Sequence, residues 1–144
     1  MSDYFEKFEK MRVAGKLASR TLDMITDNIK PGITTDYIDK IGYEFIRDNG
    51  GYSAPLYYRG FKKSLCTSLN HVVCHGIPSD RILNEGDALN IDVTAIIDEH
   101  YGDTSRMFSV GKTPIKVNNL IDTTYESMML AIGLLKPGLK LGDI

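Results

Sequence analysis

The sequence lacks several features that would assign it to a common class. The mixed-charge N-terminus does not resemble a secretory signal, which indicates a cytoplasmic protein. Because the cytoplasm is reducing, the two cysteines, Cys66 and Cys74, are expected to be free thiols rather than a disulfide. No segment approaches the roughly 20 apolar residues of a membrane span. A net charge of -2 gives no electrostatic case for nucleic acid or an anionic membrane as partner. The three histidines form no helical His-Glu-x-x-His zinc motif.

What is present suits one domain with a single core. The 144 residues are 42% hydrophobic. Apolar residues recur every three or four positions from about Asp3 to Ile29, which predicts an amphipathic helix stopped by Lys30-Pro31-Gly32. A second helix is predicted from Thr34 or Thr35, as N-cap, to the terminator Asn49-Gly50-Gly51. We expect the two to form a helical hairpin over a sheet.

Two adjacent strands carry the most informative pattern. Apolar and polar residues alternate from Ala88 to Ile97, and the segment from Tyr101 to Val110 reads as its antiparallel partner. A loop of either two or four residues around position 99 would put Asp92 and Asp103 on the same face. Arg106 would point to the opposite face.

Two carboxylates on neighbouring strands repel each other unless a cation, an arginine or a shared proton lies between them. Asp92 also lies within a run of valine and isoleucine, where an unpaired charge is costly. We therefore favour a metal, although ordinary solvent-exposed strand polarity is the alternative. Two aspartates offer too few ligands for a pair of transition metals, so a complete site cannot be built from this sequence.

A possible internal repeat bears on that shortage. A third helix is predicted to begin at Asn118 and to end in 135-LKPGL-139, which echoes 29-IKPGI-33 at an offset of 106. Chance is one explanation of so short a match. The other is that residues 1–117 form a first pseudo-repeat and residues 118–144 begin a second, within one catalytic domain that is truncated.

Several ordered motifs closely resemble the N-terminal half of a type I (bacterial-type) methionine aminopeptidase. The resemblance covers essentially the whole chain. The motifs are 9-EKMRVAG-15, 61-FKKSLCTSLNHVVCHGIP-78, 86-GD-87, 90-NIDVT-94 and 102-GDTSRM-107.

This resemblance implies the pita-bread fold, an α/β (α+β) architecture whose N-terminal half is a helical hairpin packed on an antiparallel sheet. It implies that Asp92 chelates one of two divalent ions and that Asp103 bridges both, with a histidine and two glutamates supplied by the second half. The ions would be manganese, iron or cobalt, which activate water and polarise the scissile carbonyl. The implied reaction is hydrolytic removal of the initiator methionine from nascent proteins with a small second residue.

The resemblance also implies roles for individual side chains. His75 would contact the substrate near the scissile amide, whereas from the residues alone a loop histidine bonded to backbone groups is favoured. Tyr58, Phe61 and Cys66 would line the methionine pocket, with plain core packing as an equal alternative. Thr94 would orient a carboxylate.

Departures from the family keep other readings open. Lys62 stands where relatives commonly have proline, and the second half is absent. The chain could be an inactive fragment or a non-enzymatic module of the same fold. A related peptidase that cleaves before proline is disfavoured by 74-CHGIP-78. The expected partners are nascent polypeptide N-termini, a ribosome contact stays open, and the full-length form is expected to be a monomer.

Overall fold

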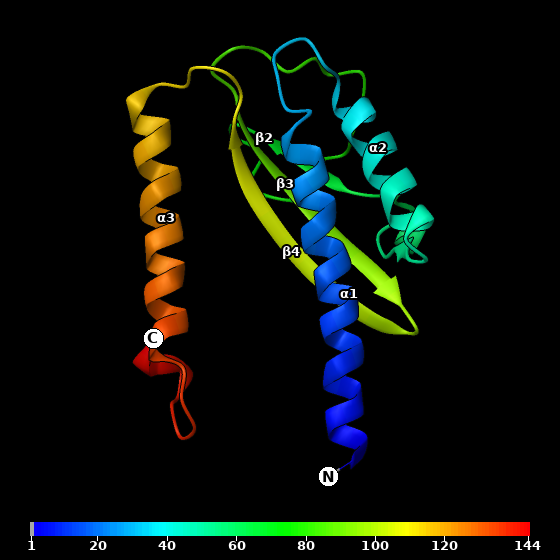
Figure 1. Cartoon of the computed structure of the whole chain (residues 1–144). Coiled ribbons are helices and arrows are strands. Elements are labelled where there is room, and N and C mark those ends of the chain that lie inside the picture. The colour runs from blue at the N-terminus through cyan, green and yellow to red at the C-terminus, as the bar shows by residue number, and fades with distance from the viewer. Residues whose placement is uncertain (1) are drawn as a thin grey trace.

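A long antiparallel hairpin lies at the centre of the fold, covered on one face by two helices (Figure 1). The computed structural model describes residues 2–144, with side chains from Tyr4 onward. The predicted helical hairpin over an antiparallel sheet is confirmed. The elements are α1 (Ser2–Thr26), α2 (Thr35–Asp48), β1 (Tyr52–Ser53), β2 (Cys66–Leu69), β3 (Ala88–Ile97), β4 (His100–Ser109) and α3 (Ile115–Leu134), with 3-10 turns at Tyr58–Gly60 and Leu141–Asp143.

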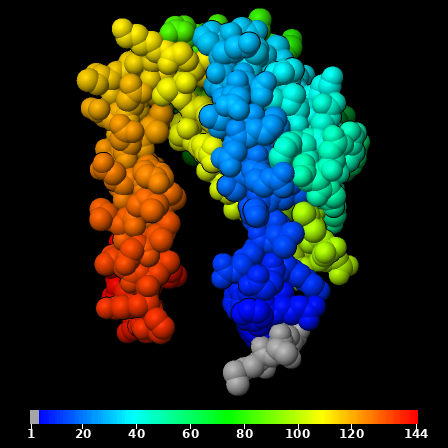
Figure 2. All heavy atoms as spheres, in the orientation of Figure 1, coloured from blue at the N-terminus to red at the C-terminus, as the bar shows by residue number. Residues whose placement is uncertain are grey.

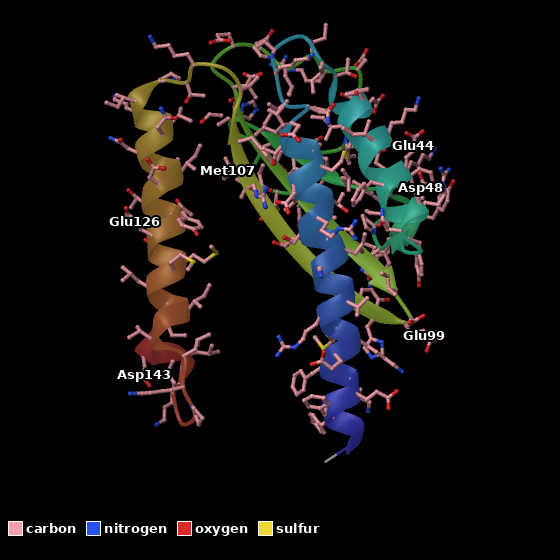
Figure 3. All side chains as sticks on the ribbon, viewed as in Figure 1. Glu44, Asp48, Glu99, Met107, Glu126 and Asp143 are labelled. Atoms are coloured by element: carbon pink, nitrogen blue, oxygen red, sulfur yellow. The ribbon has the colours of Figure 1, made fainter. Side chains whose placement is uncertain are left out.

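The register of the central hairpin is one of the two that the sequence predicts. Ile97 pairs with His100, so the loop has two residues, Asp98 and Glu99, both with positive φ. Glu99 lies at the tip of the hairpin (Figure 3). β4 pairs with β3 along its whole length, whereas the short strands β1 and β2 pair with separate parts of β3.

The core lies between the sheet and the two helices. It is formed by alternate residues of β3 and by one face of each helix, among them Leu17, Ala18, Leu22, Ile25, Ile38, Ile46, Leu89, Ile91, Val93 and Ala95. Every second residue of β3 therefore faces the helices, as the alternation predicts, and the residues between them face the other side of the sheet. Because α1 and α2 cover one face of the sheet, a functional site can form only on the opposite face.

α1 ends earlier than predicted, and the segment after it forms hydrogen bonds with a distant part of the chain. The helix ends at Thr26, three residues before Ile29 and well before the proline. The Gly32 amide donates to the Leu83 carbonyl at 2.8 Å, and the Leu83 amide donates to Ile33 at 2.8 Å. This exchange ties the turn that contains Pro31 and Gly32 to a distant segment, and the chain has already left the helix before Pro31. Of the two N-cap candidates for α2, Thr34 is the cap, and its Oγ1 accepts from the Tyr37 amide at 3.1 Å.

The start of α3 is also corrected. The helix begins at Ile115, directly after Pro114, rather than at Asn118. A proline suits this boundary because the first turn of a helix has no use for its missing N–H. The Asn118 side chain accepts instead from the hydroxyls of Thr113 and Ser109. Asn118 thus ties the first turn of α3 to the end of β4.

α3 stands apart from the rest of the molecule (Figure 2). None of its described residues is buried, and apolar side chains such as Leu120, Met128 and Leu130 are exposed. The repeated 29–33 and 135–139 segments share a conformation, since Gly32 has φ +95° and Gly138 has φ +92°. The final 3-10 turn begins at Leu141, 106 positions after the start of α2. The division into pseudo-repeats at residue 117 stays a prediction. Over residues 2–144, no helix is both long and apolar enough to cross a membrane.

Candidate functional site

One open cleft, of about 860 Å³, gathers the residues that the sequence singled out. It lies on the face of the sheet turned away from α1 and α2. All seven predicted site residues line it: Tyr58, Phe61, Cys66, His75, Asp92, Thr94 and Asp103. These residues come from two loops and three strands that are far apart in sequence, so their convergence is a property of the fold. Their individual roles stay predictions.

The two aspartates lie on the same face of the central hairpin, on adjacent strands. Thr94 is directly opposite Asp103, and Asp92 is directly opposite Ser105, so the two carboxylates are diagonal neighbours on one face. The pKa of Asp92 is raised, mainly by burial and then by the charge of Asp103 and a hydrogen bond to it, while His75 acts in the opposite direction. The carboxyl groups are close enough to share a proton or a cation.

An arginine does not neutralise this pair. Arg106 points to the helix side of the sheet, as predicted, where its Nη2 donates to Asp23 Oδ1 at 2.9 Å and its Nη1 to Thr26 Oγ1 at 3.1 Å. Two adjacent carboxylates with oxygen ligands free suit a hard or borderline divalent ion. Within residues 2–144, no group of three or more His, Cys, Asp or Glu side chains could hold a metal ion. Asp92 and Asp103 can therefore supply only part of a transition-metal ligand shell.

Gly76 fixes the position of His75. A Cβ on Gly76 would lie 2.2 Å from the Thr67 carbonyl oxygen, so only glycine allows this approach to β2. The Thr67 amide donates to the Gly76 carbonyl at 2.8 Å, and the Gly76 amide donates to Ser68 Oγ at 3.1 Å. His75 itself has φ +54°. No hydrogen bond of its ring is found among the described residues, which leaves the imidazole available to a ligand in the cleft.

A loop with left-handed residues builds one wall of the cleft. Tyr57, Arg59 and Gly60 all have positive φ, and the Tyr57 amide donates to the Phe61 carbonyl at 2.7 Å. The loop presents Tyr58 and Phe61 to the cleft. Tyr58 is 64% exposed, so plain core packing is wrong for that residue.

Cys66 supplies a neutral sulfur to the same wall. Burial, followed by the charge of Asp92, raises the pKa of its thiol to about 11, so it stays protonated near neutral pH. Cys66 and Cys74 are both free, as expected, and Cys74 is exposed.

Sequence reasoning missed Asp39, a residue of α2 that holds the segment before Cys66 in place. The buried Asp39 carboxylate accepts from the amides of Ser64 at 2.7 Å and Leu65 at 2.9 Å. Burial raises the pKa of Asp39, against the effect of these two hydrogen bonds. No local signal reveals this contact because its partners lie 25 and 26 residues away.

The cleft also has lining residues that the sequence analysis did not name. Two of them are Arg59 and Tyr101. Tyr101 could have been found, because it precedes Asp103 by two positions in an alternating strand and so shares its face. Arg59 could not, because nothing in the local pattern indicates which way a loop side chain points.

Comparisons with known proteins agree with this geometry. The sequence profile of metallopeptidase family M24 matches residues 9–144. The chain belongs to this family. It is 56% identical over 137 residues to a methionine aminopeptidase of Rickettsia prowazekii, covering 95% of this chain and 53% of the relative. It is 49% identical to the methionine aminopeptidase of Escherichia coli K12, covering 96% and 53%.

Solved structures place the chain as one half of a larger fold. The crystal structure of the Rickettsia prowazekii methionine aminopeptidase matches with a TM-score of 0.93 and 55% identity, over 96% of this chain and 56% of that one. A Xaa-Pro dipeptidase from Bacillus anthracis matches with a TM-score of 0.81 at 19% identity, over 93% of this chain and 36% of that one, which shows the fold alone. The chain therefore has the α/β pita-bread fold and resembles its N-terminal half. It spans about half the length of the curated relatives it matches.

Proposed function

We propose that this chain forms the N-terminal half of a cytoplasmic methionine aminopeptidase. This enzyme would hydrolyse the first peptide bond of nascent polypeptides and release the initiator methionine where the second residue is small. The observation that carries the proposal is that Asp92 and Asp103 are diagonal neighbours on one face of the central hairpin, in a cleft whose wall is aromatic and sulfur-containing. Similarity to methionine aminopeptidases over 95% of the chain supports it.

Asp92 and Asp103 are the residues that would hold metal. In this proposal Asp92 and Asp103 would both be ligands of a pair of divalent ions, with manganese, iron or cobalt as candidates. When bound, such ions activate water and polarise the carbonyl that is attacked. The remaining ligands, a histidine and two glutamates, would come from the second half of the fold. Thr94 lies directly across from Asp103, where its hydroxyl would orient that carboxylate.

The other lining residues would bind the substrate. A methionine side chain is neutral and polarizable, and it packs well against aromatic rings and sulfur. Tyr58, Phe61 and the protonated thiol of Cys66 offer such a wall. His75, whose ring has no hydrogen-bond partner among the described residues, would hydrogen-bond the peptide beside the bond that is cut. Its place in the same cleft, near enough to Asp92 to oppose the rise in the pKa of that carboxyl, suits this role.

Partners follow from the same reaction. The substrates would be the N-termini of nascent chains, with or without a contact to the ribosome, and the complete enzyme would act as a monomer. The alternative is a fold that has lost its chemistry: an inactive fragment or a non-enzymatic module.

The test needs a complete cleft. We define the joined chain as residues 1–144 followed by the part of the Rickettsia prowazekii enzyme that lies beyond the matched region. Methionine release from a Met-Ala-Ser peptide is measured with added manganese or cobalt for the joined chain, for residues 1–144 alone and for two variants. Asp103→Ala removes a proposed ligand, whereas Ser105→Ala changes the next residue on the same face of β4 and serves as the matched control.

We expect the joined chain to be active, residues 1–144 alone to be inactive and Ser105→Ala to be close to the parent. Asp103→Ala should lower the rate more than about 100-fold, since even residues that only support metal ligands cost 10–100-fold. An inert joined chain, alongside an active Rickettsia prowazekii enzyme, would reject the proposal in favour of the alternative.

A further inference from the structure

Arg59 is a permanent positive charge in the wall of the cleft. Among the described residues that line the cleft, it alone is lysine or arginine. Its guanidinium carbon lies 5.4 Å from the centre of the Tyr58 ring, which holds the side chain by a cation–π contact. Arg59 is exposed, and its contact with Tyr58 places the charge beside the proposed methionine pocket.

This guanidinium has no carboxylate partner in the part of the chain that the structure describes. Three of the other five arginines are paired, namely Arg12 with Glu9, Arg47 with Asp48 and Arg106 with Asp23, and neither Arg20 nor Arg81 lines this cleft. A guanidinium offers five N–H donors in a planar fork that matches a carboxylate. Arg59 has that capacity unused at the edge of a substrate cleft.

The backbone at Arg59 is unusual for this residue type. Its φ of 47° and ψ of 33° are left-handed, a conformation that costs a side-chain-bearing residue about 1 kcal/mol or more. The turn is held by hydrogen bonds from the Phe61 amide to the Tyr58 carbonyl at 3.0 Å and from the Tyr57 amide to the Phe61 carbonyl at 2.7 Å. Strain of this kind persists where the surroundings fix it, often at ligand sites.

We propose that Arg59 binds a carboxylate of the substrate downstream of its second residue, so that peptides with an acidic third or fourth residue are favoured. This inference rests on the proposed function. The methionine side chain is neutral, and a small second residue carries no acid. The third residue is therefore the first whose side chain can bring a carboxylate to Arg59.

The test uses the joined chain with added manganese and three peptides, Met-Ala-Asp-Ser, Met-Ala-Asn-Ser and Met-Ala-Lys-Ser. Arg59→Asn removes the charge and keeps a residue that tolerates left-handed backbone. Arg59→Lys keeps the charge and loses the fork. Arg81→Gln is the matched control, because Arg81 lines a separate pocket of about 280 Å³ and forms no ion pair among the described residues.

We expect the parent to favour the Asp peptide over the Asn peptide by about threefold in kcat/KM, as for an exposed ion pair. The preference should lie in KM, since the contact is remote from the reacting bond, and should vanish at about 0.5 M salt. Arg59→Asn should abolish it, Arg59→Lys should reduce it and Arg81→Gln should retain it. A residue that only packed on Tyr58 would change all three peptides equally.

The outcomes separate the two proposals. If the joined chain releases methionine from all three peptides equally, or if Arg59→Asn retains the preference, the role of Arg59 is rejected and the proposed function stands. If no peptide is cleaved while the Rickettsia prowazekii enzyme cleaves them, the proposed function is rejected, and the inference with it.

Discussion

Replacing Gly102 with alanine tests how closely α1 must approach the sheet that carries Asp103. Gly102 is buried on the helix side of β4. A Cβ built there would lie 2.2 Å from the Ala14 carbonyl carbon and 2.3 Å from its oxygen. These are backbone atoms of a helix, so no side-chain rotation can relieve the clash.

The expected cost follows from that distance. Real Cβ contacts essentially never fall below 3.0 Å, so α1 must retreat by roughly 0.8 Å or β4 must bend. α1 carries Leu17, Leu22 and Ile25 into the core, and a retreat would loosen all three. Overpacking a core costs about 1–3 kcal/mol, and a clash between two backbones belongs at the upper end. Alanine would regain about 0.5–1 kcal/mol over glycine in a strand. We expect a net loss of about 2 kcal/mol.

Urea unfolding of the joined chain, followed by circular dichroism, measures this loss. Gly15→Ala is the matched control, because a Cβ on Gly15, one residue after Ala14 in α1, meets nothing within 4 Å. It should be neutral or stabilise by up to about 1 kcal/mol. A Gly102→Ala variant within about 0.5 kcal/mol of the parent would refute the close approach of α1 to β4, since that is the range of changes that touch no such contact.

Three further predictions concern single groups and the exposed surface. Asp39→Ala should cost about 1–3 kcal/mol because two buried amides lose their acceptor, whereas Asp39→Asn keeps an acceptor and should cost less. Burial raises the pKa of Asp39 above its ordinary value of 3.8, so the parent loses free energy of unfolding as pH rises from 3.8 through the raised pKa. Asp39→Asn cannot ionise, so its free energy of unfolding in urea should rise relative to that of the parent over this range. A difference that does not change with pH would contradict this. With a pKa of about 11, only about one part in a thousand of the Cys66 thiol is ionised at pH 8. A disulfide reagent should therefore modify the exposed Cys74 first and Cys66 slowly. Equal rates for the two cysteines would contradict the burial and the raised pKa of Cys66. Residues 1–144 alone should self-associate because apolar side chains of α3 are exposed, and light scattering that shows a clean monomer with a cooperative melt would count against that.

The sequence was most informative in the strands, where alternation of polar and apolar residues decides which face each side chain occupies. Alternation in β3 and β4 put Asp92 and Asp103 on one face under either hairpin register, because both registers differ by an even number of residues. The same period turned Arg106 away from the site, where it meets Asp23. These predictions needed no knowledge of the rest of the fold.

The two helix boundaries that were predicted wrongly have different causes. α1 ends before Ile29, where Gly32 pairs with Leu83, and local propensity contains no record of so distant a partner. α3 begins at Ile115, directly after Pro114, which is a local signal that a start at Asn118 overlooks. The orientation of Arg59 depends on a strained loop, which the pattern of polar and apolar residues does not encode.

The most direct test of the central claim is to locate manganese in crystals of the joined chain by anomalous diffraction. We predict anomalous density in contact with the carboxylates of both Asp92 and Asp103, and loss of that density in Asp103→Ala. Manganese bound only elsewhere, with the two carboxyl groups hydrogen-bonded to each other in its presence, would contradict the claim that this cleft is half of a metal-dependent active site.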